Sequence, residues 1–233
     1  MVPTRDVDPA ELYRQERLAL VELLRTLDAG QLATVVPATP AWSVHDATSH
    51  LVGIAADLNA QRFPVPGSDP NDWTAHQVAM RRDATVADLA AEWDREGPGF
   101  EDGLRLFGHE MGAHYLGDLM HHVSDIHAAL GRSPVRDDLV IAVALDFYLR
   151  SFEDGLAEAG IGAVEVRSGD ERFLLGAGEP VAAVAASPFE LFRSLGGRRT
   201  LAEVRGLDWS GDVDTIAPLV SRYPLPAASL HEV

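Results

Sequence analysis

The sequence contains no cysteine and no lysine, and all 19 of its basic residues are arginine. A chain without cysteine can form neither disulfides nor thiolate metal sites, and it has no cysteine nucleophile. A chain without lysine cannot form a Schiff base through a side-chain amine or hold a phosphate with a P-loop lysine. Any thiol chemistry of this protein must therefore use a thiol that comes from outside the chain.

Positive charge and long apolar runs are also scarce. The 36 acidic residues give a net charge of −17, whereas binding nucleic acid or an anionic membrane through bulk electrostatics requires a basic face. No apolar run approaches the roughly 20 residues of a membrane span, and the N-terminal stretch lacks the basic-then-apolar layout of a secretory signal. We therefore expect a cytoplasmic protein that binds neither nucleic acid nor membranes. The sequence does not indicate an oligomeric state.

Most of the first 160 residues carry the apolar spacing and the capping residues of long helices. Asp8 is placed to cap a first helix, with Pro9 at its first position and Glu11 at the capping-box position. Ser43, followed three residues later by Asp46, marks the start of a second helix. Helical spacing predicts further helices over residues 73–82, 86–106, 112–130 and 137–159. Long amphipathic helices with short connections are typical of an up-and-down bundle.

The pattern changes after residue 160. Short runs between glycine and proline turns predict strands over residues 162–168, 171–178 and 180–186. Ser187, with Glu190 three residues later, then signals another helix, and short helical pieces follow it. The predicted fold class is therefore α+β, with a four-helix bundle over residues 1–160 and a small α/β domain over residues 161–233.

The stretch "HEMGAHYLGDLMHHVSDIH" places five of the nine histidines in one predicted helix. Tyr115, Leu119, His122 and Ile126 follow the spacing of an inward-facing stripe, so His122 occupies a slot where an apolar residue is the default. Asp118 lies four residues before His122, which projects both side chains the same way. A carboxylate and an imidazole at this spacing can hold a metal ion from one helix.

A third ligand is expected from a neighbouring helix. His50 borders the apolar stripe of the second helix, whereas His45 lies near the start of that helix and is expected to be exposed. An inward histidine is about as often a core group that is hydrogen-bonded to a carbonyl. His114 precedes Asp118 by four residues and could replace it as a ligand. The remaining histidines of the stretch are expected at the surface or behind the ligands: His109, His121 and His127.

Four stretches resemble, in order, the motifs of one family. "WSVHDATSHLVG" resembles a W-S/T-V-x-D pattern that leads to an H-L-x-G histidine, and "DPNDWTAHQVAMRRDATVADLAAEWDREGP" resembles a D-x-W-T-x-x-Q-V…R-R…L…E-W segment. "DLMHHVSDIHAALGR" is similar to a D-V-x-x-H-x-x-D-I-R-x-A-L-G helix, and "PFELFRSLGGRRTLAEVRGLDWSGD" to a C-terminal F-E-L-x-R…L-x-W-x-G-D signature. The sequence thus resembles the mycothiol-dependent maleylpyruvate isomerase-like proteins of the DinB superfamily, from about residue 10 to nearly the C-terminus.

The resemblance implies a DinB-like four-helix bundle followed by a small α/β domain. It also implies a divalent metal, usually zinc, held by a histidine of the second helix and by a carboxylate and a histidine of a later helix. On this sequence those positions are His50, Asp118 and His122. Better-known members have glutamate where this chain has the shorter Asp118, and they often carry histidine and arginine where it has Ser124 and His127.

Two imidazoles and one carboxylate leave an open coordination position, which is the mark of a catalytic zinc site. A thiol bound there would lose its proton, since a metal cation lowers the pKa of its ligand. The thiolate, from mycothiol or a similar thiol, could then isomerise or add to a small electrophilic substrate. Asp125 is expected to orient an imidazole, and Arg81 and Arg82 to hold carboxylates of the thiol or substrate. Alternatively, each arginine pairs with Asp83 or another surface acid.

Other functions remain compatible with the same residues. The chain could be a metal-binding protein without turnover, or a hydrolase in which the metal activates water instead of a thiol. A metal-free interaction protein is a third alternative. The resemblance implies the fold and the metal site far better than the particular reaction, so the sequence identifies neither the physiological substrate nor the thiol.

Overall fold

In the computed structural model, which describes residues 4–230 and 232, the long helices begin at the residues whose side chains cap them. Asp8 accepts a hydrogen bond from the backbone of Ala10 at the start of the first helix. Ser43 and Asp46 form a reciprocal capping box at the start of the next long helix. These local contacts satisfy backbone groups that a helix leaves without partners at its start.

The described residues form two units, which divide between residues 135 and 136. The unit of residues 8–135 contains the helices α1 (Pro9–Arg25), α2 (Ala29–Leu32), α3 (Val44–Asn59), α4 (Pro70–Met80), α5 (Val86–Phe107) and α6 (His109–Ala129). The other unit contains residues 4–7 and 136–230.

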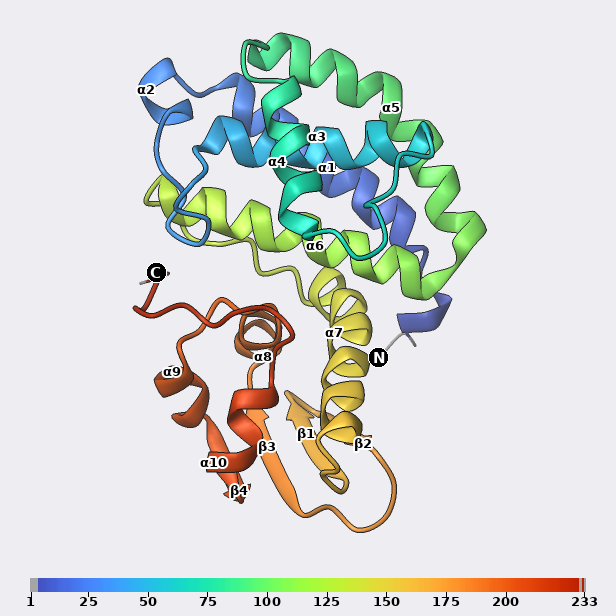
Figure 1. The fold of residues 1–233 in the computed structure, drawn as a ribbon, viewed down its shortest axis with the longest axis vertical. Helices are drawn as coiled ribbons and strands as arrows, with labels where there is room; N and C mark the ends of the chain where they lie inside the picture. Colours follow the sequence, from blue (N-terminus) through green and yellow to red (C-terminus); the bar gives the residue numbers. More distant parts are fainter. Residues whose placement is uncertain (1–3, 231, 233) are drawn as a thin grey trace. The chain divides into compact units, whose positions relative to one another are not determined.

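The four long helices α1, α3, α5 and α6 form the predicted bundle (Figure 1). Helix α1 packs against α5 and α6, and α3 packs against α5 on one side and α4 on another. Every residue of α3 from Ala47 to Asp57 is buried, because α4 covers a face that a bundle alone would leave to solvent. The side chains of α3 can therefore reach both the bundle interior and the α3–α4 contact.

The second unit combines a long helix with a small sheet. Its elements are η1 (Thr4–Asp6), α7 (Asp138–Glu158), β1 (Val164–Ser168), β2 (Glu171–Leu175), β3 (Ala182–Ala186), α8 (Pro188–Leu195), α9 (Leu201–Arg205), β4 (Asp208–Gly211), α10 (Val213–Ile216) and η2 (Ala217–Leu219). The strand order is β2-β1-β3-β4, with β1 parallel to β3 and the two outer strands antiparallel to their neighbours. The α+β fold class predicted from the sequence is confirmed.

Two features of this unit differ from the expectation. Helix α7 packs against α8 and strand β2, so it belongs to the unit that contains the sheet and the boundary lies before α7. The sequence prediction had placed this boundary after the helix, near residue 160. Apolar spacing shows that a helix has a buried face but not which partner covers it. Strand β4 lies where short helical pieces were expected; it has only four residues and takes its conformation from pairing with β3, where Trp209 lies opposite Val184.

None of the helices that the structure describes is both long and apolar enough to cross a membrane. The cytoplasmic location stays a prediction.

Acid is expected to weaken the second unit through Glu190. Arg199 donates two hydrogen bonds to this half-exposed carboxylate, at 2.9 and 2.8 Å, and thereby holds the pKa of Glu190 below its ordinary value. The stabilisation is present above the unfolded-state pKa of about 4.3 and is lost as the pH falls through the folded-state value. Glu190→Gln should cost at most about 1 kcal/mol at neutral pH, because solvent screens the pair.

Urea unfolding at neutral pH and at about pH 3 tests this prediction, since the carboxyl is ordinarily protonated at the lower value. The two proteins should differ at neutral pH, and the difference should become smaller in acid. A stability difference that stays the same at both pH values would contradict the role of Glu190.

Candidate metal centre

Helices α3 and α6 bring three predicted ligands together. His50 comes from α3, and Asp118 and His122 come from successive turns of α6. One ligand atom from each of the three side chains lies within 4.8 Å of the others. Asp118 Oδ2 is 4.0 Å from His50 Nε2, and Asp118 Oδ1 is 3.9 Å from His122 Nε2. Both imidazoles thus turn the same kind of nitrogen toward one carboxylate.

The three side chains differ in their exposure. His50 and His122 are buried, whereas the side chain of Asp118 is 29 % exposed. The cluster is therefore closed by protein around its imidazoles and open beside its carboxylate. Of the three side chains, Asp118 is therefore the most accessible to solvent.

The donor set suits a divalent transition metal. Imidazole nitrogen and carboxylate oxygen are common zinc ligands, and tetrahedral ligands about 2.0–2.1 Å from the ion lie about 3.4 Å apart. Asp118 lies 3.9 and 4.0 Å from the two imidazoles, and the three ligand atoms lie within 4.8 Å of one another, so the side chains would have to move closer together to reach that spacing. The shorter Asp118 reaches both imidazoles even though better-known members of the resembled family have glutamate there.

Trp42 lies against the two imidazoles of the cluster, a position that was not predicted from the sequence. Its ring centroid lies 4.9 Å from that of His50 and 5.9 Å from that of His122. The two imidazoles are themselves 5.1 Å apart and nearly perpendicular. Trp42 immediately precedes Ser43, the residue that caps α3, so its position is tied to the start of that helix. Its place in the "WSVHD" motif was the one available signal.

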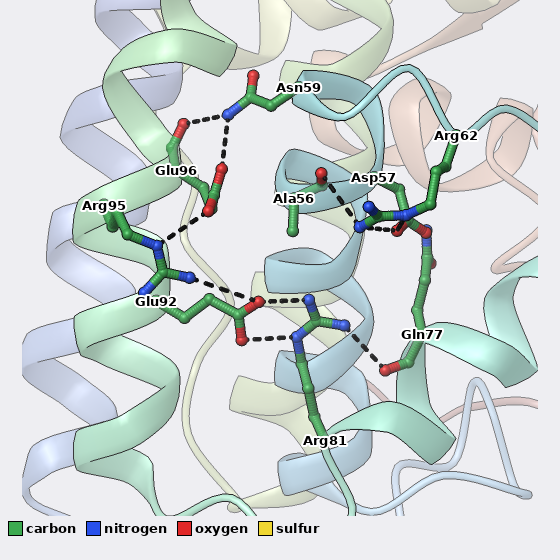
Figure 2. Close-up of polar contacts among 9 residues, drawn as sticks. All are labelled: Ala56, Asp57, Asn59, Arg62, Gln77, Arg81, Glu92, Arg95 and Glu96. Atoms are coloured by element: carbon green, nitrogen blue, oxygen red, sulfur yellow. Dashed lines mark hydrogen bonds and ion pairs between the residues drawn. The ribbon is translucent and has the colours of Figure 1, made fainter.

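Gln77 and Asp57 lie behind His50. The Gln77 side chain joins His50 Nδ1, at 2.8 Å, to Asp57, and Arg62 in turn pairs with Asp57. Figure 2 shows the Gln77, Asp57 and Arg62 side chains in contact beside α3. Gln77 belongs to the "DWTAHQV" motif, but the spacing of that motif gave no reason to connect it with His50.

Asp125 lies behind the other imidazole, where the sequence analysis predicted it. Its side chain is fully buried, and its Oδ2 is 3.9 Å from His122 Nδ1. This distance exceeds that of a hydrogen bond, so these two atoms are neighbours that are not hydrogen-bonded to each other. The role of Asp125 in orienting the imidazole stays a prediction.

Arg81 is held by protein groups in this structure. It donates two hydrogen bonds to Glu92, at 2.9 and 2.6 Å, and a third to the backbone oxygen of Gln77 (Figure 2). This geometry favours the alternative in which the arginine pairs with an acid, although the partner is Glu92 rather than Asp83. Arg82 is exposed, and its predicted contact with a thiol or substrate carboxylate stays a prediction.

The other histidines that the structure describes lie outside the cluster of three. His121, expected either at the surface or behind the ligands, is buried, because α6 is covered on several sides. His45, expected to be exposed, is half-buried and donates a hydrogen bond to the Ala84 carbonyl. His127 donates one to the Ser133 carbonyl.

His114, the alternative ligand, stacks on the adjacent Tyr115 with ring centroids 4.7 Å apart. Burial lowers the pKa of His114, and the negative charge of Asp118 opposes that shift. Burial also raises the pKa of Tyr115 to about 12, to which the charge of Asp118 adds. Tyr115 therefore remains a neutral phenol across the physiological range.

Comparisons with known proteins place the chain in a family. Residues 13–135 match the family model described as the mycothiol maleylpyruvate isomerase N-terminal domain. A crystal structure of the mycothiol-dependent maleylpyruvate isomerase aligns with 85 % of this chain and 92 % of its own, at 14 % identity and a TM-score of 0.50. A mutant of that isomerase aligns with 84 % of this chain and 92 % of its own, at 13 % identity and a TM-score of 0.48. No curated protein sequence matches.

The likeness to the first of these structures, at a TM-score of 0.50, supports the fold. The family model carries more weight, because it spans more than half of the 233 residues, including both helices that supply the cluster. The chain therefore belongs to the mycothiol maleylpyruvate isomerase N-terminal domain family.

Proposed function

We propose that this protein is a metal-dependent enzyme that uses an external low-molecular-weight thiol, mycothiol or one like it, on a small electrophilic substrate. The reaction is either isomerisation of the substrate or transfer of the thiol sulfur to it. Membership of the isomerase family supports the thiol and the general reaction. The cluster of His50, Asp118 and His122 is the observation that carries the proposal, since it supplies two imidazoles and one carboxylate within 4.8 Å.

The chain's own residues would divide the work. His50, Asp118 and His122 would hold a divalent ion, with zinc the one that this donor set suits best. Such an ion supplies a Lewis acid that lowers the pKa of a thiol. Trp42 covers the two imidazoles on one side, and the partly exposed Asp118 marks the side open to the thiol and substrate.

The chemistry requires a nucleophile that the chain lacks. A thiolate that adds to a carbon–carbon double bond allows rotation about that bond, and its later expulsion completes an isomerisation and returns the thiol. If the new sulfur–carbon bond is retained and the neighbouring carbon takes up a proton, the product is a thioether. The chain contains no cysteine, so in both reactions the sulfur must come from the external thiol.

The test is turnover of maleylpyruvate and of other small unsaturated acids, with and without mycothiol, by zinc-loaded and chelator-treated protein. We expect turnover only when both thiol and metal are present. Turnover without thiol would contradict the proposal and indicate a hydrolase. A protein that retains metal but transforms no substrate with any thiol would instead be a binding protein.

A further inference from the structure

We propose that Gln77 is a positioning residue for the metal centre. It fixes the His50 imidazole in the tautomer that carries its proton on Nδ1, and Asp57 in turn fixes Gln77. The inference deepens the proposed function, because it identifies a residue that sets the affinity of His50 for a metal. The tautomer itself does not depend on a metal being bound.

The assignment begins at Asp57, the far end of the hydrogen-bonded series. Arg62 contacts Asp57 Oδ1 through both Nε, at 2.9 Å, and Nη2, at 2.8 Å. Asp57 Oδ2 lies 3.0 Å from Gln77 Nε2. An ionised carboxylate only accepts hydrogen bonds, so the group that faces Asp57 must be the NH₂ of the Gln77 amide. The orientation of this amide, which the two similar ends of a glutamine otherwise leave ambiguous, is thereby determined.

The amide orientation then determines the state of His50. With its NH₂ turned to Asp57, Gln77 presents Oε1 to His50 Nδ1 at 2.8 Å. An amide oxygen only accepts, so Nδ1 must carry the proton. In the neutral imidazole the lone pair then lies on Nε2, the atom 4.0 Å from Asp118. Only this tautomer can offer a metal the nitrogen that faces the other two ligands.

The protein holds Gln77 from its backbone side as well. A Cβ added to Gly53 of α3 would lie 2.5 Å from the Gln77 Cβ, so only glycine lets α4 approach α3 this closely. Arg81, clamped by Glu92, donates to the Gln77 backbone oxygen at 3.1 Å (Figure 2). The Gln77 side chain is almost completely buried. Several independent contacts therefore hold the amide at the one place from which it reaches both His50 and Asp57.

The experiment uses the full-length protein and begins without metal. ¹⁵N chemical shifts of the His50 ring should show the proton on Nδ1 in the wild type. Gln77→Leu removes the acceptor and should give a mixture of tautomers. Zinc affinity, measured by competition with a chromophoric chelator, should then fall about 10–100-fold, the usual cost of losing a group that orients a ligand.

Asp57→Asn gives a sharper test. In the series of hydrogen bonds Asp57 contacts Gln77, and Gln77 contacts His50, so this substitution can act on His50 only through Gln77. The introduced amide can donate to Gln77 Oε1, which frees Gln77 to turn its NH₂ toward His50 and to favour the wrong tautomer. Zinc affinity should fall by about 10-fold or more. The double variant Gln77→Glu/Asp57→Asn exchanges the carboxylate and the amide; the carboxylate then accepts from both neighbours, and the Nδ1–H tautomer and most of the zinc affinity should return.

Asn59→Ala is the matched control. Like Asp57, Asn59 lies on α3. Its side chain donates two hydrogen bonds to another helix, one to the backbone and one to the side chain of Glu96. Its loss should change neither the tautomer nor the zinc affinity. A wild-type His50 protonated on Nε2, or Gln77→Leu with wild-type tautomer and affinity, would overturn the inference. If the wild type binds no zinc, the proposed function fails, and the tautomer still decides the role of Gln77.

Discussion

His122→Ala is expected to abolish the retention of zinc. The substitution leaves one imidazole and one carboxylate from the chain, and it removes the only ligand pair held at fixed spacing on a single helix. Loss of a group that only orients a ligand lowers metal affinity about 10–100-fold. Loss of the ligand His122 itself should lower the zinc affinity further. Chelator competition measures the loss, and the elemental content of the purified variant gives an independent value.

His121→Ala is the control for this experiment. His121 is adjacent, lies on the same helix and is buried to a similar extent, but it is not one of the three clustered residues. Its removal tests whether any buried histidine of α6 would have the same effect. Full zinc occupancy in His122→Ala, or equal losses in the two variants, would contradict the ligand assignment.

Arg17→Met is expected to destabilise the unit of residues 8–135 by about 3–5 kcal/mol, the range found when one partner of a buried ion pair is removed. Arg17 on α1 contacts Glu101 on α5 at 3.1 Å, and both side chains are only 5 % exposed. A Cβ on Gly97 would lie 2.7 Å from the Arg17 guanidinium carbon, so the guanidinium rests directly on α5. Without the arginine, the Glu101 carboxylate remains buried and has lost its cation.

Urea unfolding of three variants separates this effect from a general loss of packing. Arg17→Met/Glu101→Leu should recover much of the stability, since no unpaired charge then remains buried. Arg105→Met removes an exposed cation that pairs with Asp8 and Asp102, and it should cost about 0–1 kcal/mol. A small effect of Arg17→Met, comparable to that of Arg105→Met, would show that the buried pair is not important for stability.

The parts of the fold that the sequence predicted correctly are those set by neighbouring residues. The starts of α1 and α3 follow from the Asp8 cap and the Ser43–Asp46 box, which involve residues at most three positions apart. Asp118 and His122 face the same way because a helix places residues four apart on one side. The apolar stripe of α3 made His50 a candidate, the family resemblance implied it as the third ligand, and the structure places its Nε2 4.0 Å from Asp118 Oδ2. Its role as a ligand stays a prediction.

The parts that the sequence did not predict depend on contacts between distant residues. Helix α7 carries an apolar face in the sequence, but only the structure shows that α8 covers it. The pairing of Arg81 with Glu92 and the contact of Gln77 with His50 join residues 11 and 27 positions apart. No local pattern signals such contacts, since the first joins the end of α4 to α5 and the second joins α4 to α3.

The presence of a metal held by His50, Asp118 and His122 is the claim on which the proposed function depends. The most direct test is the metal content of gently purified wild-type protein, measured by elemental analysis beside that of His50→Ala. We predict about one zinc or similar divalent ion per chain in the wild type and its loss in the variant. A wild-type protein without metal, or a variant that keeps its full complement, would contradict the account.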